Sequence, residues 1–174
     1  MAKKSKERDH VDRFLEEIEA ELPPIDLEVE GIVDRVGGLS RRFHRLLDET
    51  VAEFGLTNGE WKVLNSLRHA GPPYRRSAGQ LAERADLSTG AMTNRLDRLE
   101  GAGLVRRLPD PDDRRGVQVE LTDAGRKLGE DSVSAQAAKE AVVVAALDER
   151  EKRELNVLLR RLMLEFERRE QSGS

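Results

Sequence analysis

Apolar residues recur at helical spacing through most of this chain. The first stripe lies within residues 8–22 and stops at Pro23, because proline lacks the amide donor that a helix interior needs. A second, longer stripe runs from Ile32 to Phe54, and Gly55 then suits a helix end. The pattern therefore predicts two helices in the first third of the chain.

Start signals predict three shorter helices in the middle of the chain. Thr57-Asn-Gly-Glu60 and Ser77-Ala-Gly-Gln80 each read as a capping box, in which a hydroxyl accepts from the amide three residues later. Ser88 can cap a third helix that ends near residues 101–103. The last two helices, joined by a tight turn at Asp86, form a helix-turn-helix, although bare helical pairs of this kind are common.

The segment that follows switches to the period of a β-strand. Residues 105–108 form a short strand candidate, residues 109–116 a polar loop, and residues 117–121 alternate between apolar and polar. This is the layout of a wing. Thr122 can cap a long helix that reaches Leu147, and a last helix carries an apolar stripe from Leu155 to Phe166. We therefore expect one mainly α domain over residues 1–174, a winged helix-turn-helix with a small β-hairpin.

Composition narrows the class of protein. Charged residues make up 37% of the 174 and aromatics only 3%, which fits a solvated helical protein that completes its core by pairing with a second copy. There is no cysteine, so disulfides and thiolate metal sites are excluded. No run of about eighteen apolar residues and no secretory signal is seen, so we expect no membrane partner and a cytoplasmic location.

Charge is unevenly distributed along the chain. The net charge is −4, yet residues 75–115 hold nine arginines against seven acidic residues. A relatively basic middle between acidic ends is what a localised DNA-facing surface produces, although the contrast is modest.

With these elements in order, residues 56–125 resemble the multiple antibiotic resistance regulator (MarR) family. The matching strings are LTNGEWKVLNSL, LAERADLSTGAMTNRLDRLEGAGLVRR and DPDDRRGVQVELTDAG, of which the last is the most specific. The resemblance implies a sequence-specific regulator, generally a repressor, that binds double-stranded DNA as a two-fold homodimer. It assigns dimerisation to residues 8–54 and 123–170, and the winged helix-turn-helix lobe to residues 56–121.

Such a lobe places the N-terminal end of its second helix against base edges in the major groove. Arg95 and Arg98, further along that helix, suit phosphates, and so do Ser77 and Gln80 at the start of the preceding helix. Met92, Leu96 and Leu99 are expected in the core, and Ser88 can also act only as a helix cap. The expected groove-facing residues are Ser88, Thr89, Gly90, Ala91, Thr93 and Asn94.

The wing tip combines carboxylates with arginines. Phosphates repel carboxylates, so Asp112 or Asp113 is expected to pair with an arginine and shape the loop. The resemblance assigns entry into the narrow minor groove to Arg115, with Arg114 as an alternative. Without the resemblance, a loop of this composition is more often a solvated turn.

Family resemblance also implies regulation by a small aromatic or anionic effector, bound between the dimer helices and the DNA-binding lobe. Phe43 and Trp61 are alternatively plain core residues. An extra N-terminal helix and the PPIDLE string resemble a urate-sensing subgroup, but Ile18 stands where that subgroup has tryptophan. The candidate effector contacts are Arg41, Arg42, Phe43, His44, Trp61 and Tyr74.

Other classes of function are disfavoured. The chain has no GxSxG, HExxH or GxxxxGK string, so we expect no enzyme activity and no cofactor. His10, His44 and His69 are widely spaced, which disfavours a metal site. The main alternative is a helical dimeric interaction protein that does not bind DNA.

Overall fold

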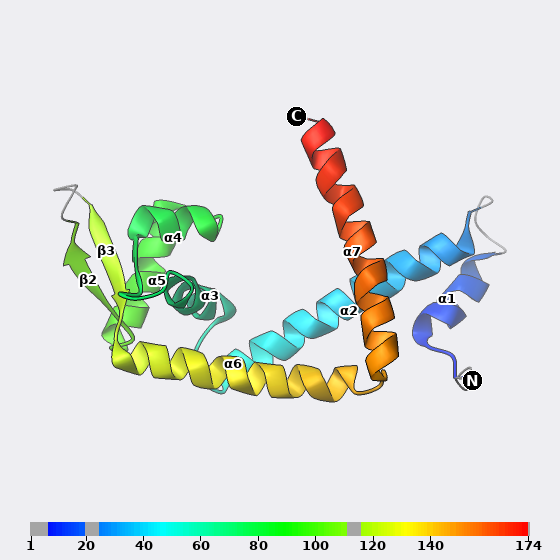
Figure 1. The fold of residues 1–174 in the computed structure, drawn as a ribbon, viewed down its shortest axis with the longest axis horizontal. Coiled ribbons are helices and arrows are strands. Elements are labelled where there is room, and N and C mark those ends of the chain that lie inside the picture. The colour runs from blue at the N-terminus through cyan, green and yellow to red at the C-terminus, as the bar shows by residue number, and fades with distance from the viewer. Residues whose placement is uncertain (1–6, 20–24, 111–115, 174) are drawn as a thin grey trace. The chain divides into compact units, whose positions relative to one another are not determined.

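The computed structural model describes residues 7–19, 25–110 and 116–173, which form helices and a small sheet (Figure 1). The chain divides into two compact units, Met1–Asn58 and Gly59–Ser174. The elements in order are α1 (His10–Glu19), α2 (Leu27–Ala52), α3 (Asn58–Arg68), β1 (Arg75–Ser77), α4 (Ala78–Arg84), α5 (Thr89–Gly101), β2 (Val105–Pro109), β3 (Val117–Leu121), α6 (Asp123–Val144) and α7 (Glu149–Ser172).

In the first unit α1 packs along α2. Val11 is 2% exposed, and a Cβ on Gly31 would lie 3.3 Å from Leu15 Cδ1, so the glycine permits the close approach. Asp26 caps α2 by accepting hydrogen bonds from two amides of its first turn, at 3.0 and 3.3 Å. Residues 20–24, where the first predicted helix ends, lie outside the described part.

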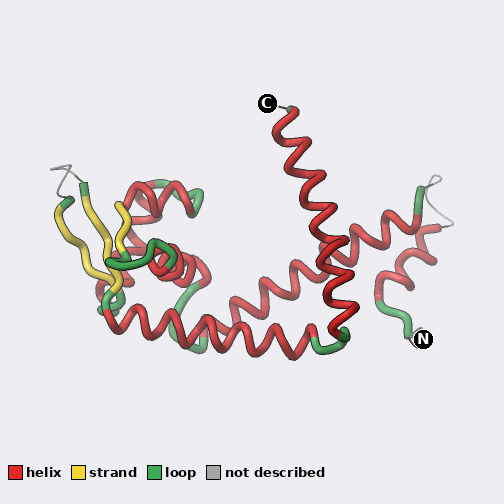
Figure 2. The backbone as a smooth tube through the Cα atoms, viewed as in Figure 1, coloured by secondary structure: helices red, strands yellow, loops and turns green. Residues whose placement is uncertain are grey.

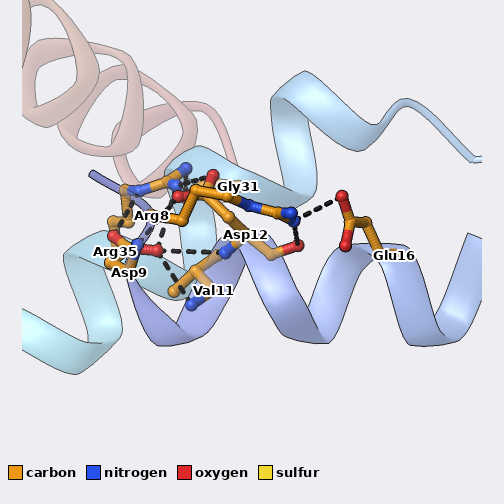
Figure 3. A network of polar contacts seen from close by, with 7 residues as sticks. All are labelled: Arg8, Asp9, Val11, Asp12, Glu16, Gly31 and Arg35. Atoms are coloured by element: carbon orange, nitrogen blue, oxygen red, sulfur yellow. Dashed lines mark hydrogen bonds and ion pairs between the residues drawn. The ribbon is translucent and has the colours of Figure 1, made fainter. Parts of the chain in front are cut away.

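A network of charged side chains holds the two helices together (Figure 3). Arg35 on α2 donates from Nε to Asp9 Oδ2 at 2.9 Å and from Nη2 to Asp12 Oδ1 at 2.5 Å. The hydrogen bonds from Arg35 hold the pKa of Asp9 well below its ordinary value. Arg8 pairs with Glu16 along the same face of α1.

The second unit contains a three-stranded antiparallel sheet in the order β1-β3-β2 (Figure 2). The predicted hairpin of β2 and β3 is confirmed, with Val105 opposite Leu121 and Pro109 opposite Val117. The prediction was nevertheless incomplete, because β1 adds a third strand on the far side of β3. Three residues are too few for an alternation of apolar and polar positions to show.

The core of this unit lies between the sheet and helices α3 to α5. Leu64, Leu67, Leu81 and Val119 are at most 1% exposed. Each such side chain contributes about 1.5–3 kcal/mol by leaving water. The predicted core face of α5 is confirmed: Met92, Leu96 and Leu99 are each 1% exposed.

The start of α6 is joined tightly to the start of β2. Thr122 caps α6 by accepting from the Gly125 amide at 3.0 Å, and its hydroxyl donates to the Gly103 carbonyl at 2.7 Å. The Thr122 amide donates to Leu104 O at 3.1 Å. A Cβ at Gly125 would lie 1.9 Å from that same carbonyl oxygen, so only glycine fits.

The last two helices differ from the prediction at one boundary. Helix α6 ends at Val144, so the expectation that it reaches Leu147 was wrong: the Leu147 amide donates to Val144 O in a turn, and Asp148 then caps α7. No side chain of α7 is buried, and its leucines are exposed. Among the described helices, none has the length and apolar character needed to cross a bilayer.

Candidate nucleic-acid interface

Helix α4 begins where β1 ends, at Ser77. The Ser77 hydroxyl accepts from the Gln80 amide at 3.1 Å, and Gln80 Oε1 accepts from the Ser77 amide at 3.1 Å. This is the predicted capping box. It orients the first turn of α4 and leaves the Gln80 side chain exposed.

A turn with one left-handed residue, Asp86 at φ +51°, connects α4 to α5. Ser88 then caps α5 by accepting from the Ala91 amide at 3.3 Å, as predicted. The cap leaves the Ser88 side chain exposed, so it does not preclude a second role.

Helix α5 has two chemically distinct faces. Its buried face carries the core residues described above, while its N-terminal half is open on the other side. Thr93 Oγ1 donates to Thr89 O at 2.9 Å, which fixes the hydroxyl and leaves its lone pairs available as acceptors. A Cβ at Gly90 would meet no atom within 4 Å, so packing within the protein does not require glycine there. The exposed residues of this half are Ser88, Thr89, Gly90, Ala91, Thr93 and Asn94.

Two arginines of α5 reach back to the first turn of α3. The Arg95 guanidinium lies over Gly59, where a Cβ would come within 2.3 Å of Arg95 Cζ. Arg98 Nε pairs with Glu60 Oε1 at 3.0 Å, and the Glu60 side chain is only 5% exposed while that of Arg98 is 67% exposed. A buried carboxylate thus holds a solvent-facing arginine in one orientation.

Arg107 connects β2 to α5, a role that could not be predicted from the sequence. Its Nη1 donates to Asp97 Oδ1 at 2.6 Å and to Glu100 Oε2 at 2.8 Å, and its Nη2 donates to Thr93 O at 3.2 Å. Partial burial lowers the pKa of Arg107, but the hydrogen bonds with the two carboxylates outweigh this effect and raise it above its ordinary value. These hydrogen bonds join the wing strand β2 directly to helix α5.

The role of Glu120 could not be predicted from the sequence either. Its side chain is 8% exposed and accepts hydrogen bonds from Arg75 and Arg106, which stand opposite it on the two neighbouring strands. Burial raises the pKa of Glu120, but the hydrogen bonds from the two arginines outweigh it and hold that pKa below its ordinary value. The alternation of apolar and polar residues over 117–121 could not reveal this role, because that pattern is also typical of a strand with one solvated face.

The wing tip itself lies outside the described residues, including Asp112, Asp113, Arg114 and Arg115. At its base, the Asp110 amide donates to Gly116 O at 3.1 Å. Gln118 Nε2 donates to Asp110 Oδ2 at 2.6 Å, so Asp110 serves to close the loop.

The six residues expected to contact an effector fall in both units. On α2, Phe43 is half-buried and Arg41, Arg42 and His44 are exposed. In the second unit Trp61 Nε1 donates to Ser132 Oγ on α6 at 3.1 Å, and Trp61 lines a cavity. Tyr74 is half-buried in the loop before β1, with φ +60°.

Known proteins with similar sequences are regulators of transcription. The sequence profile described as the MarR family matches residues 56–117. The chain is 34% identical over 142 residues to the HTH-type transcriptional regulator PecS of Dickeya dadantii, which covers 82% of this chain and 86% of that protein. It is 37% identical over 92 residues to the multiple antibiotic resistance protein MarR of Escherichia coli, covering 53% of this chain and 62% of MarR.

Solved structures share the fold. A crystal structure of an E. coli MarR mutant complexed with operator DNA is similar with a TM-score of 0.61 and 28% identity, covering 80% of this chain and 99% of that one. The YusO protein of Bacillus subtilis is similar with a TM-score of 0.69 and 25% identity, over 82% of this chain and 99% of that one. Both match over nearly their whole length.

Proposed function

The chain belongs to the MarR family of transcriptional regulators, and we propose that it is a homodimeric repressor that binds a pseudo-palindromic operator and is released by a small anionic ligand. The family is one of regulators and not of enzymes. The observation that carries the proposal is the N-terminal half of α5, whose exposed face consists of short polar or small side chains while its other face is anchored in the core.

Short side chains allow the backbone of a recognition helix to approach the base edges closely. Within this set, Asn94 is the best candidate for base recognition, because a carboxamide can both donate to and accept from an adenine edge. The similarity to an E. coli MarR mutant complexed with operator DNA supports this orientation for α5.

Phosphate contacts are assigned to the flanking groups. Arg98 keeps its terminal nitrogens in a fixed direction through the Glu60 pair, and a fixed guanidinium loses less freedom on binding a phosphate. Ser77 and Gln80 at the start of α4, together with Arg95, take the remaining backbone positions. Arg115, with Arg114 as the alternative, reaches the minor groove from the wing tip.

Homodimerisation is proposed from the apolar side chains that each unit leaves exposed. Helix α2 presents Val29, Ile32, Val33, Val36 and Leu39 to solvent. A contiguous stripe of this kind marks an association surface. The corresponding stripe on α7 consists of Leu155, Leu158, Leu159, Leu162 and Phe166.

Binding to the DNA upstream of the gene, measured by fluorescence anisotropy at several salt concentrations, tests the proposal. Phosphate contacts release counterions, so the affinity should fall steeply with salt. Affinity that is weak and independent of salt for every fragment would instead favour an interaction protein that does not bind DNA.

Replacing the proposed base reader separates specific from nonspecific binding. Asn94→Ala should lower the affinity for the operator by about 1–3 kcal/mol and leave binding to random duplex almost unchanged, since one base contact is worth this amount. Asn156→Ala on α7 is the matched control and should leave both affinities unchanged. A uniform loss on both DNAs would contradict the assignment of Asn94 to base recognition.

A further inference from the structure

Helix α5 is held against β2 along one stripe of its surface. Thr93, Asp97 and Glu100 are spaced four and three residues apart, so they lie above one another on one face of the helix. Arg107 on β2 donates to all three, to Asp97 Oδ1 at 2.6 Å, to Glu100 Oε2 at 2.8 Å and to Thr93 O at 3.2 Å. From Thr93 to Glu100 these contacts extend along about 10 Å of helix.

The strand also holds the helix through its main chain. Glu100 Oε1 accepts from the Arg107 amide at 2.9 Å, so both oxygens of this carboxylate are bound by the same residue of β2. The pairing of β2 with β3 fixes where that amide lies. Glu100 therefore joins α5 to the backbone of the sheet, and not only to the end of a long side chain.

The packed face of α5 cannot by itself determine how the helix is rotated about its axis. Met92, Leu96 and Leu99 are buried, but the burial of apolar surface has no directional preference. Hydrogen bonds are directional and weaken steeply when they are bent. The contacts of Arg107 with two turns of α5 thus resist a rotation that the apolar contacts alone would permit.

Small rotations matter for base recognition. Side chains of a helix reach about 5–6 Å from its axis, so a rotation of about ten degrees displaces their ends by about 1 Å. A binding group has to be held within about 0.5 Å of its productive position. Asn94 follows Thr93 directly, and the Thr93 carbonyl is one of the three groups that Arg107 binds.

From these contacts we infer that Arg107 is a positioning residue for base recognition, which sets the rotation of α5 and thereby the direction of Asn94 without contacting DNA. The inference rests on the proposed function, in which the N-terminal half of α5 enters the major groove. Both terminal nitrogens of Arg107 are engaged within the protein. Its side chain is 27% exposed, whereas that of Arg98, which is proposed to bind phosphate, is 67% exposed.

Arg107 also accounts for two carboxylates on a helix that is proposed to lie against phosphates. The side chains of Asp97 and Glu100 are 56% and 39% exposed, and the guanidinium between them balances one of the two charges. A neutral residue at position 107 would therefore combine a loss of position with added repulsion. Lysine keeps the charge but offers one nitrogen in place of a planar fork, so Arg107→Lys isolates the positioning role.

Fluorescence anisotropy of the full chain with the upstream DNA fragment and with a random duplex of equal length tests the inference. In Arg107→Lys the affinity for the upstream fragment should fall by about 5- to 140-fold, the cost of one lost base contact. The affinity for random duplex should stay within about twofold of the wild type at every salt concentration, because the charge is retained. Equal losses on both DNAs, or no loss on either, would overturn the inference.

Arg106→Lys is the matched control. Arg106 precedes Arg107 in β2, so its side chain lies on the opposite face of the sheet, where it binds Glu120. The same substitution there should leave the ratio of the two affinities unchanged. A fall in this ratio as large as in Arg107→Lys would mean that any loosening of the sheet has the effect, and would contradict a specific role of Arg107.

A double variant shows whether Arg107 acts through Asn94. If the contact of Asn94 is already lost in Arg107→Lys, adding Asn94→Ala should cause little further loss of affinity for the upstream fragment. Two fully additive losses would contradict this route from Arg107 to the bases.

Asp97→Asn keeps the inference testable if Arg107→Lys fails to fold. It removes one acceptor of Arg107 together with one negative charge, and the charge alone would tighten binding to both DNAs. The loss of positioning should instead lower the preference for the upstream fragment over random duplex. Glu83→Gln, at an exposed carboxylate on α4, makes the same change of charge and should keep the preference. An unchanged or increased preference in Asp97→Asn would overturn the inference.

A measurement without DNA separates this inference from the proposed function. In free Arg107→Lys the amides of α5 should exchange with solvent faster than in the wild-type protein, as hydrogen-exchange mass spectrometry can measure. A wild-type protein with no preference for the upstream fragment would contradict the proposed function, while faster exchange in the variant would still support the attachment of α5 by Arg107. Unchanged exchange together with an unchanged preference would overturn the inference.

Discussion

Glycine at position 90 has no role in the packing of the protein itself. A Cβ there would meet nothing within 4 Å, and its φ is not in the left-handed region. Gly90 lies in the proposed groove-facing half of α5, and we propose that its missing side chain allows the DNA backbone or a base edge to approach closely.

Gly90→Ala should therefore have opposite effects on stability and on binding. The free energy of unfolding should rise by up to about 1 kcal/mol, because alanine is the better helix former. The operator affinity should fall. Urea unfolding and fluorescence anisotropy measure the two quantities. Gly101→Ala, at the far end of the same helix and equally open, should leave operator binding unchanged.

Glu120 illustrates the opposite case, a charged residue that the sheet needs. Glu120→Gln removes the charge that faces Arg75 and Arg106. We expect the free energy of unfolding to fall by about 2 kcal/mol. This is less than for a fully buried pair, because both arginines keep contact with water. Chemical denaturation measures it, and a loss below about 0.5 kcal/mol would mean that water replaces the pair.

The same residue predicts a dependence on pH. The folded protein lowers the pKa of Glu120, so its contribution to stability is present above the glutamate pKa of the unfolded chain and is lost as the pH falls through the folded value. Stability should thus decline in acid below about pH 4.5, and the decline should be shallower in Glu120→Gln. Identical slopes would contradict this role.

At the scale of elements, α1 depends on one arginine. Asp9 and Asp12 of the α1 segment both bind Arg35 on α2, and apart from Val11 the described residues of α1 are at least partly exposed. In Arg35→Ala the α1 amides should exchange with solvent much faster at neutral pH, as hydrogen-exchange mass spectrometry can measure. Arg13→Ala, at an exposed site on α1, is the control.

Acid should act on the same contact. Arg35 lowers the pKa of Asp9, so the contact is fully formed above the ordinary aspartate pKa and is lost as the pH falls through the lower folded value. Exchange of α1 in the wild-type protein should therefore remain slow at pH 5. Fast exchange at that pH would mean that the Arg35–Asp9 pair does not determine how firmly α1 is held on α2.

Local signals predicted most elements of the second unit correctly. The caps at Ser77, Ser88 and Thr122 are formed by side chains that only need their own following amides, so short-range sequence contains the information. The β1 strand was missed because three residues have no periodicity, and its pairing with β3 depends on a contact with residues more than forty positions away.

That omission also explains the missed site residues. In the predicted hairpin of two strands, Glu120 would lie on a face that is open to solvent. With β1 present, Arg75 and Arg106 close over it from both sides, and the carboxylate is buried. The cavity that Trp61 lines, between α3, α4 and α6, could not be predicted from the sequence either. Asn65 and Gln136 both line it, but seventy residues of chain separate them.

At the scale of the whole molecule, the exposed stripe of α7 predicts dependence on a second copy. A chain that ends before Leu155 loses this stripe and should sediment as a monomer that binds the operator far more weakly, because two half-sites are no longer held about one helical turn apart. Analytical ultracentrifugation and anisotropy test both statements. A stable monomer with full operator affinity would contradict the proposed homodimer.

The joint at Gly125 gives α6 the properties of a lever. The first turn of α6 is held against Gly103 and Leu104, at the start of the wing. The helix itself spans 22 residues, or about 33 Å. A tilt of about five degrees at the distant end therefore displaces the clamped end by roughly 3 Å, which is close to the rise of one base pair. In the proposed DNA complex, a tilt of this size would be enough to move the wing out of register with its groove.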